Sequence, residues 1–328
     1  MRVLFSTYPW AFETPGGGEI QLRKYAEYLP SHGVDVRLHD TWRANFASIS
    51  LVHFFSCIGG SVHFCNYVRQ RGLPLVISSS LWITPETAHR YPVDEIRAQL
   101  ALADVVVTNS DTESDLLAEV LALPRERFMA VMNGFDPRFA EPQDPLLFRI
   151  AFGIEGQFIL NVGNIEPRKN QLELVRALKG HPLPLVLLGH KRDEAYAAQV
   201  LAEGGSKVRY IGPLDHADPR LASALGACSV FVLPSTLETP GLAALEAAAA
   251  GVPVVVTSEG PTRDYFGTHA WYVDHRDCHD IRRGIDQALS GASGPGLRAH
   301  VVPRFSWPTV TERLVEAYGV AKQRRSSR

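Results

Sequence analysis

Short apolar runs alternate with segments of helical periodicity along most of the chain. Arg2–Ser6 is an apolar run that predicts a strand. Glu19–Leu29 follows, with apolar or small residues spaced by three or four positions, as in an amphipathic helix. Strands that alternate with helices predict a parallel sheet with helices on both faces. The other strands predicted in this half are Val34–Leu38, Ser50–Phe55, Leu75–Ser78 and Val105–Asn109.

The pattern is interrupted at Glu141-Pro-Gln-Asp-Pro145 and then begins again. Because a domain holds roughly 150 residues, the 328-residue chain is long enough for two such units. We expect an α/β protein with two doubly wound, Rossmann-like domains, 1–145 and 146–304, facing across a cleft, and a last helix with a basic tail at 305–328. Such sheets bind ligands at the carboxyl ends of their strands. Strands predicted in the second domain are Phe158–Gly163, Leu183–Gly189, Val208–Ile211, Val230–Leu233, Val252–Thr257 and Trp271–Val273.

Composition and charge argue against several classes of protein. The formal net charge of −2 gives no global field that would favour nucleic acid. No stretch reaches the ~18 apolar residues of a membrane span, and the first apolar run is too short for a signal peptide. The four cysteines form no C-x-x-C pair and no zinc-ligand spacing, so we expect reduced packing residues, no metal site and a cytoplasmic protein. The basic tail Lys322–Arg328 is either a solvated chain end or a contact with a membrane surface.

One carboxylate stands alone in an apolar helix. Eight of the nine residues of Leu242–Ala250 are Leu or Ala, and Glu246 is the exception. Such a helix is expected to be buried, and a buried carboxylate needs hydrogen-bond donors. The donors are either groups of the protein itself or two adjacent hydroxyls of a ligand such as a ribose. This segment alone does not decide between the two.

A second carboxylate, Glu238, precedes the same helix by a short turn. The turn Thr239-Pro240-Gly241-Leu242 places free backbone N–H groups at the helix start, and Gly241 allows a ligand to approach closely. Backbone amides and the positive end of the helix dipole favour an anion there. The order of carboxylate, glycine-containing turn and buried carboxylate therefore predicts a binding site for a charged ligand.

Two further loops follow predicted strands and open helices. Arg168 and Lys169 lie on the loop that begins at Gly163-Asn164, where two cations could neutralise a diphosphate and assist its departure. The alternative is a pair of solvated surface charges. Gly16-Gly17-Gly18-Glu19 follows the first strand, where its amides could approach a substrate, or it is a flexible surface turn.

Together these segments resemble the retaining glycosyltransferases of family 4, which have the GT-B fold. The resemblance covers nearly the whole chain, and it is the ordered set of motifs that makes it specific. Three segments, Pro167–Asn170, Glu238–Leu242 and Thr262–Gly267, resemble bacterial surface-polysaccharide and O-antigen transferases. The family motifs are matched by Gly16–Glu19, Asn133–Asp136, Val162–Asn170, Ile211–Asp215, Leu225–Ser235, the E-x7-E pair Glu238 and Glu246, and Phe305–Trp307 before the helix that crosses back to the first domain.

The resemblance implies a role for each matching residue. Lys169, helped by Arg168, should hold the donor diphosphate, Glu238 should contact the transferred sugar, and Glu246 should bind the ribose. The other donor-binding positions implied are Gly17, Gly18, Gly163, Asn164, Thr239, Pro240, Gly241 and Leu242. The donor would be a UDP-, GDP- or TDP-linked sugar, used as a substrate without cofactor or obligatory metal. The acceptor would be a glycan or a lipid-linked glycan, met by peripheral contact with the inner membrane, and the anomeric configuration would be retained.

The sequence also departs from the family pattern. Asn164 stands where many relatives have Arg, and Thr239-Pro240 changes the wall of the sugar pocket. Many relatives carry a His after a middle strand of the first domain, where this chain has Ser80 and Trp82 as acceptor-side candidates. His53 is a weaker candidate, and a satisfied core histidine is the alternative. These departures leave open a non-catalytic nucleotide-sugar-binding or scaffold subunit of a glycan assembly complex.

Overall fold

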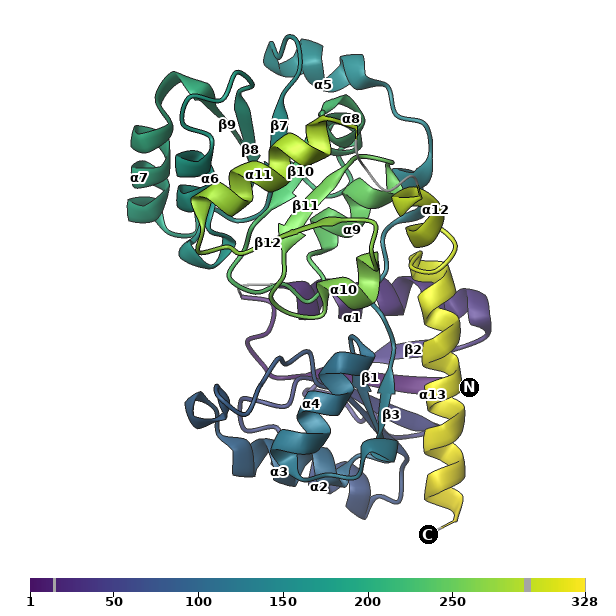
Figure 1. Ribbon diagram of the computed structural model, residues 1–328. Helices are drawn as coiled ribbons and strands as arrows, with labels where there is room; N and C mark the ends of the chain where they lie inside the picture. Colours follow the sequence, from purple (N-terminus) through teal and green to yellow (C-terminus); the bar gives the residue numbers. More distant parts are fainter. Residues whose placement is uncertain (14–15, 292–295, 328) are drawn as a thin grey trace. The chain divides into compact units, whose positions relative to one another are not determined.

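The computed structural model describes residues 1–13, 16–291 and 296–327. The chain forms two compact units, one comprising residues 1–134 with 307–328 and the other comprising residues 135–306 (Figure 1). Each unit is built on a parallel sheet of six strands. The expected α/β fold with two doubly wound parallel sheets is therefore confirmed, and the predicted strands are found within one or two residues of their expected bounds.

The sheet of the first unit has the strand order β2-β1-β3-β4-β5-β6, with all pairs parallel. Its order reverses between β1 and β3, so the loops after these two strands start at a topological switch point. The central strands are buried along their whole length, as their continuous apolar runs predict. The strands are β1 Arg2–Thr7, β2 Asp35–Leu38, β3 Leu51–Phe55, β4 Leu75–Ser78, β5 Val105–Thr108 and β6 Phe128–Ala130.

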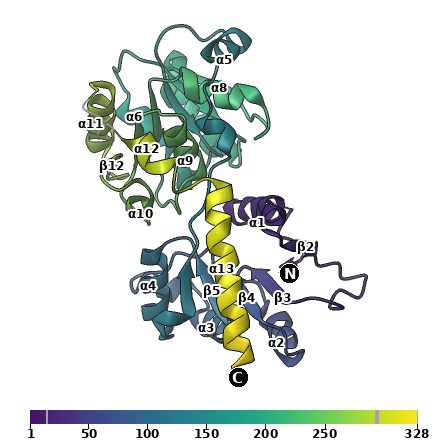
Figure 2. The same ribbon diagram turned by 90° about the vertical axis from the view of Figure 1, so that its right-hand side faces the viewer.

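Helices cover both faces of this sheet. The helices are α1 Gly17–Tyr28, α2 Val62–Gln70, α3 Val93–Leu102, α4 Asp111–Leu121 and α13 Trp307–Ser326. Residues of α2, α3 and α4 share one core cluster with Leu4, Val52 and Ile77 of the strands. On the other face, α13 packs against α1, β4 and β5 (Figure 2). The connection from β2 to β3, residues 39–50, contains no helix.

The sheet of the second unit has the order β12-β11-β10-β7-β8-β9 and is also parallel throughout. Here the order reverses between β7 and β10, which are hydrogen-bonded neighbours. The loops that follow β7 and β10 therefore leave the sheet side by side at its carboxyl edge. The strands are β7 Ile159–Val162, β8 Leu185–Leu188, β9 Val208–Gly212, β10 Val230–Leu233, β11 Val254–Thr257 and β12 Trp271–Val273.

The helices of the second unit also pack on both sides of its sheet. Residues of α6, α7 and α11 form one core cluster with strand residues such as Ile159, Leu187 and Val232. The mostly Leu and Ala helix α9 packs against β10 and β11 and is buried, as expected. The helices are α5 Pro145–Phe152, α6 Gln171–Ala177, α7 Glu194–Gly204, α8 Pro219–Ala227, α9 Leu242–Ala249, α10 Thr262–Phe266, α11 Cys278–Leu289 and α12 Leu297–Val301.

The chain passes from one unit to the other at two places that lie next to each other. Phe135 N–H donates to the carbonyl of Phe305 at 2.8 Å, and Phe135 forms a parallel bridge with Ser306. A Cβ on Gly134 would lie 2.7 Å from the backbone nitrogen of Trp307, so only glycine fits this approach. The beginning and the end of the second unit are thus held together.

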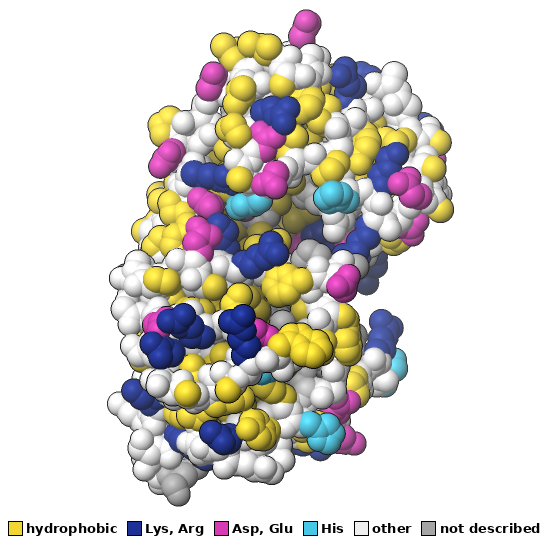
Figure 3. Space-filling model, turned by 180° about the vertical axis from the view of Figure 1, so that it is seen from behind, with side chains coloured by type: hydrophobic (Ala, Val, Ile, Leu, Met, Phe, Trp, Pro, Cys, Tyr) yellow, Lys and Arg dark blue, Asp and Glu magenta, His cyan; other side chains and the backbone are white. Residues whose placement is uncertain are grey.

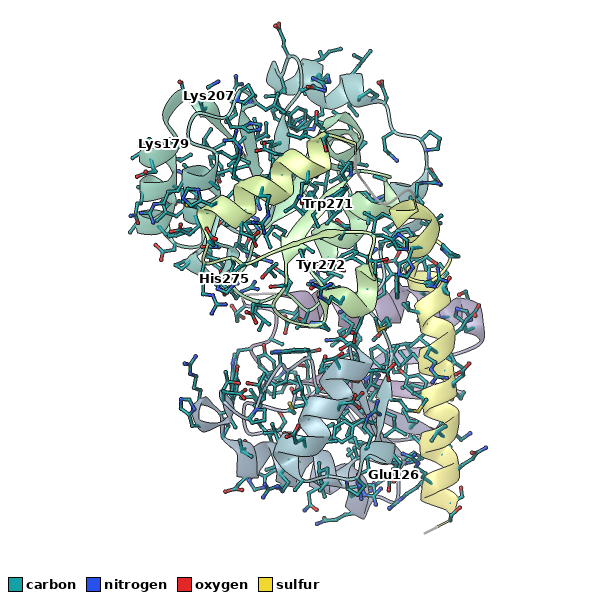
Figure 4. All side chains as sticks on the ribbon, viewed as in Figure 1. Glu126, Lys179, Lys207, Trp271, Tyr272 and His275 are labelled. Atoms are coloured by element: carbon teal, nitrogen blue, oxygen red, sulfur yellow. The ribbon has the colours of Figure 1, made fainter. Side chains whose placement is uncertain are left out.

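The basic tail is partly tied down. Arg324 donates to the carbonyls of Asp104 and Glu126, the latter labelled in Figure 4, and Arg325 donates to those of Arg69 and Gly72. These two arginines therefore fix the last turns of α13 to the first unit, whereas Arg328 lies outside the described residues. No helix among the described residues is both long and apolar enough to cross a membrane. On the face shown in Figure 3, Lys and Arg side chains are interspersed with Asp and Glu.

Candidate functional site

The loops after β7 and β10 bring two cations onto one carboxylate. Lys169 Nζ lies 2.5 Å from Glu238 Oε1, and Arg168 Nη1 lies 4.0 Å from the same oxygen. The side chain of Glu238 is only 5% exposed and that of Lys169 14%, whereas Arg168 is half exposed. Arg168 and Lys169 are therefore not simply two solvated charges, because Lys169 forms a largely buried ion pair with Glu238. These three residues form a contiguous group that we call the cation pocket.

Backbone contacts hold the two loops of the cation pocket together. Thr236 N–H donates to the carbonyl of Arg168 at 2.9 Å. Asn170, at a left-handed φ of 61°, donates from its side chain to the carbonyls of Pro234 (3.0 Å) and His275 (2.7 Å). His275, labelled in Figure 4, follows β12, so one amide joins the loops after three strands. Asn170 belongs to the predicted motif Val162–Asn170, but its hydrogen bonds to the other two loops were not predicted.

The turn after Glu238 depends on glycine. Gly241 has a φ of 82°, and a Cβ on it would lie 2.8 Å from Leu233 and 3.2 Å from Glu238 Oε2. Gly260 has a φ of 91°, and its Cβ would lie 2.2 Å from the carbonyl of Glu238. Pro240 and Gly241 are buried, and Thr239 and Leu242 are half-buried. Glu238 is therefore held from both sides where α9 begins, with Gly241 as the N-cap of that helix.

The other positions predicted on the first loop surround the same group. A Cβ on Gly163 would lie 3.5 Å from the Cε of Lys169, so the glycine backbone packs along the lysine stem. The carbonyl of Asn164 accepts from Gln171 Nε2 at 2.9 Å, and its side chain is half-buried. The structure thus brings together Gly163, Asn164, Arg168, Lys169, Glu238 and the turn to Leu242.

Glu246 has its own partners one to two turns further along α9. Its Oε1 lies 2.7 Å from Nε2 of His216, a residue of the loop between β9 and α8. The Nδ1 of His216 lies 3.2 Å from Nη2 of Arg138, and Arg138 also donates to the carbonyl of His216. A donor for Glu246 was expected from the sequence, but neither His216 nor Arg138 was predicted as its partner. The first interpretation of this carboxylate, a donor within the protein, is therefore found, and binding of a ribose at Glu246 stays a prediction.

In the first unit, Gly18 and Ser80 come together at the switch point between β1 and β3. A Cβ on Gly18 would lie 3.9 Å from Ser80 Oγ, and both residues line a cavity of about 190 Å³. Ser80 has a φ of 45° and is exposed. Glu19 lines the same cavity, where it accepts from Tyr8 Oη and from the N–H of Gly16. Gly17 begins α1, and Trp82 is half-buried outside this lining.

His53 lies in the core and not at this cavity. Its side chain is fully buried, with Nδ1 2.8 Å from Tyr318 Oη and Nε2 2.8 Å from Ser78 Oγ. Burial lowers the pKa of His53 to about 3. The satisfied core histidine, which the sequence left as the alternative, therefore describes His53 in this structure.

A buried acid that the sequence analysis did not single out supports the loop carrying Ser80. Glu113, on α4, accepts from Ser79 Oγ (2.6 Å) and from the N–H groups of Leu81 (3.2 Å) and Asn109 (2.9 Å). Burial raises its pKa to about 7, although these hydrogen bonds favour the charged form. The only sequence signal was a charge in the first turn of a capped helix.

A larger apolar hollow lies beside the cavity, at the ends of β1, β2 and β3. Its volume is about 920 Å³, and His39, Arg23 and His63 also line it. The helix-free connection from β2 to β3 forms part of its wall. The apolar lining includes Phe5, Phe12, Leu22, Phe54 and Phe64.

Among the described residues, no group of three His, Cys, Asp or Glu side chains could hold a metal ion.

Comparison with solved structures defines the class of fold. HepE from Anabaena, in complex with UDP and glucose, superposes with a TM-score of 0.78 and 18% identity, over 97% of this chain and 99% of the other. Sucrose-phosphate synthase from Thermosynechococcus elongatus superposes with a TM-score of 0.78 and 17% identity, over 97% and 98%. At this identity the likeness shows the fold alone, which is the GT-B fold of glycosyltransferase structures.

Within that class, residues 147–301 match the family described as glycosyl transferases group 1. The O-antigen chain mannosyltransferase B of Escherichia coli is 28% identical over 253 residues, 71% of this chain and 65% of the relative. The D-inositol 3-phosphate glycosyltransferase of Stackebrandtia nassauensis is 30% identical over 268 residues, 74% of this chain and 59% of the relative. The aligned part therefore spans slightly less than two thirds of each relative.

Proposed function

We propose that the protein is a retaining, metal-independent glycosyltransferase that moves a sugar from a nucleotide sugar to a hydroxyl of a glycan or glycolipid. The observation that carries this proposal is the cation pocket, where Lys169 and Arg168 converge on Glu238 beside the start of α9. Cations and free backbone amides at one sheet edge suit a diphosphate. The match of residues 147–301 to the family of glycosyl transferases group 1 supports the same activity.

Each part of the pocket has a role in the proposed reaction. Lys169 and Arg168 would form ion pairs with the diphosphate. The backbone N–H groups of Gly241 and Leu242 would donate hydrogen bonds to it. Lys169 would then stabilise the negative charge that develops as the nucleoside diphosphate leaves. Glu238, released from the lysine, would accept hydrogen bonds from hydroxyls of the transferred sugar. The acceptor hydroxyl would attack from the face that the diphosphate leaves, which retains the anomeric configuration.

The residues around this pocket would complete the donor site. Glu246 would accept hydrogen bonds from the ribose hydroxyls. The walls of the donor site would be formed by Gly163, Asn164, Thr239 and Pro240. In the proposal the second unit binds the donor, and the first unit binds the acceptor.

The acceptor site is proposed at the cavity that Gly18 and Ser80 share, with Trp82 nearby. An acceptor with an apolar part is supported by the hollow of about 920 Å³, which is lined mostly by aromatic and aliphatic side chains. We therefore propose a lipid-linked glycan acceptor, reached at the cytoplasmic face of the inner membrane. The name of the Escherichia coli relative supports a role in surface-polysaccharide synthesis.

The experiment is a donor screen followed by turnover. UDP-glucose, GDP-mannose and a TDP-sugar are added singly, and thermal unfolding is followed, because a ligand that binds only the folded state raises the apparent stability. Release of nucleoside diphosphate is then measured with and without glycan and glycolipid acceptors. Stabilisation and release with one donor class support the proposal. Tight donor binding without release under any acceptor indicates a non-catalytic scaffold, and the absence of binding to every donor contradicts both.

A further inference from the structure

We infer that His216 positions Glu246 for the ribose of the nucleotide and thereby sets the preference of the site for ribonucleotides. This inference rests on the proposed function, because it needs a nucleotide at Glu246. It concerns a residue on a different loop from the E-x7-E segment. Its basis is a chain of contacts that runs from Arg138 through His216 to Glu246.

The hydrogen bonds fix which nitrogen of His216 donates. Arginine has only N–H groups and cannot accept, so Nδ1 of His216, 3.2 Å from Arg138 Nη2, must be the acceptor of that contact. The hydrogen of the ring therefore lies on Nε2 and is donated to Glu246 Oε1 at 2.7 Å. The imidazole of His216 therefore lies between the guanidinium of Arg138 and the carboxylate of Glu246 and bonds to both.

One carboxylate oxygen of Glu246 is left for a ligand. Among the described residues, Oε1 accepts from His216, and no hydrogen bond is made to Oε2. The side chain of Glu246 is 9% exposed, so the group is confined but reachable. Its neighbours along α9 are Leu and Ala, which offer no donor. A hydroxyl that donates to Oε2 would therefore complete the hydrogen bonding of this carboxylate.

The imidazole itself contacts Glu246, Arg138 and Phe139. Asp215, the preceding residue, accepts from the N–H of Ala217, which shapes the loop after β9. Arg138 binds both Nδ1 and the carbonyl of His216. The ring of Phe139 packs edge to face on the imidazole at a centroid distance of 5.5 Å. A donor fixed this firmly selects one orientation of the carboxylate and so directs Oε2 at a constant position.

The test compares ribonucleotides with their 2′-deoxy counterparts. Binding of UDP, dUDP, GDP and dGDP is measured by calorimetry for the wild type, His216→Ala and His216→Gln. His279→Ala removes an exposed histidine of the same unit and is the matched control. Circular dichroism and thermal unfolding verify that each variant is folded.

We expect the wild type to bind the ribonucleotide of one base roughly 10-fold more tightly than its deoxy form, the value of one charge-assisted hydrogen bond. His216→Ala should lose most of that ratio, and His216→Gln should recover it, because its side-chain amide can donate to Glu246. The inference is overturned if His216→Ala weakens the ribo and deoxy forms equally, or if His216→Gln recovers nothing. A wild type that binds none of the four nucleotides would instead overturn the proposed function together with this inference.

Discussion

Lys169 and Glu238 form a largely buried ion pair, with Nζ 2.5 Å from Oε1, although they are separated by 69 positions in the sequence. The pair forms because β7 and β10 are neighbours in the sheet, so the loops that follow them begin side by side. In the proposed reaction the lysine exchanges this carboxylate for a diphosphate.

Replacing Lys169 with Ala should reduce release of nucleoside diphosphate by roughly 100-fold or more, as loss of one group that stabilises a leaving anion does. The matched control is Lys179→Ala, which removes an exposed lysine of the same unit (Figure 4). Because Lys169→Ala leaves Glu238 buried with Arg168 4.0 Å away, Lys169→Gln is measured as well. Unchanged turnover in either folded variant would contradict the role of Lys169.

Gly260→Ala should disrupt the site, because the new Cβ would lie 2.2 Å from the carbonyl of Glu238. Gly180→Ala is the control, since Gly180 also has a positive φ but has nothing within 4 Å of its Cβ position. Both variants carry backbone strain, and only Gly260→Ala displaces Glu238. We expect donor affinity to fall several-fold more in Gly260→Ala, measured by calorimetry. Equal losses in the two variants would mean that strain alone matters.

Glu113 should make stability depend on pH. Burial raises its pKa from 4.5 to about 7, so in that interval the folded protein binds more protons than the unfolded chain. The free energy of unfolding should therefore fall by about 3 kcal/mol as pH rises from about 4.5 to about 7, and level off above. Glu113→Gln should remove this slope in urea unfolding.

His53 acts in the opposite direction in the same experiment. Its pKa is lowered from 6.5 to about 3, so its contribution to stability is lost as pH falls below about 6.5. The effect of Glu113 is therefore read from the difference between the wild type and Glu113→Gln at each pH, since His53 is common to both. A difference that does not change with pH would show that Glu113 does not titrate in this range.

Changing both Arg324 and Arg325 to Ala should lower the free energy of unfolding by roughly 1–3 kcal/mol, because four hydrogen bonds to backbone carbonyls are lost. Lys322→Ala, at an exposed position of the same helix, should have little effect. Urea unfolding measures both. If the double variant is as stable as the control, the tail contributes no stability, and weaker binding to anionic vesicles would then favour a membrane-surface role.

The sequence predicted the sheets well because their strands are buried and parallel. Such strands appear as continuous apolar runs, as in Val230–Leu233 and Val254–Thr257, where every residue is buried. Glu246 stood out for a related reason, since a charge in an apolar helix is conspicuous. The pairing of Lys169 with Glu238 was not predicted, because it depends on which strands are neighbours and not on spacing along the chain.

The partners of the carboxylates of Glu246 and Glu113 could not be predicted for the same reason. His216 lies in the loop after β9 and Arg138 in the short 3-10 helix Pro137–Ala140, and neither belongs to a local pattern that signals a contact with Glu246. Glu113 lies in the first turn of α4, where an acidic residue is common, and only the folded chain shows that it reaches Ser79 and Leu81. Polar contacts between distant segments leave little trace in hydrophobic periodicity, which is the signal that sequence analysis uses.

Gly134–Phe135 lies next to Phe305–Trp307. The second unit is therefore an insertion in the first, and its two ends are neighbours in space. Removing residues 135–306 would leave two ends of the first unit in contact, which a peptide of a few residues could connect at little cost in loop entropy. Conversely, residues 135–306 have neighbouring termini and a core of their own. We therefore expect that protein engineering can divide the chain into two separate polypeptides, each carrying one complete sheet.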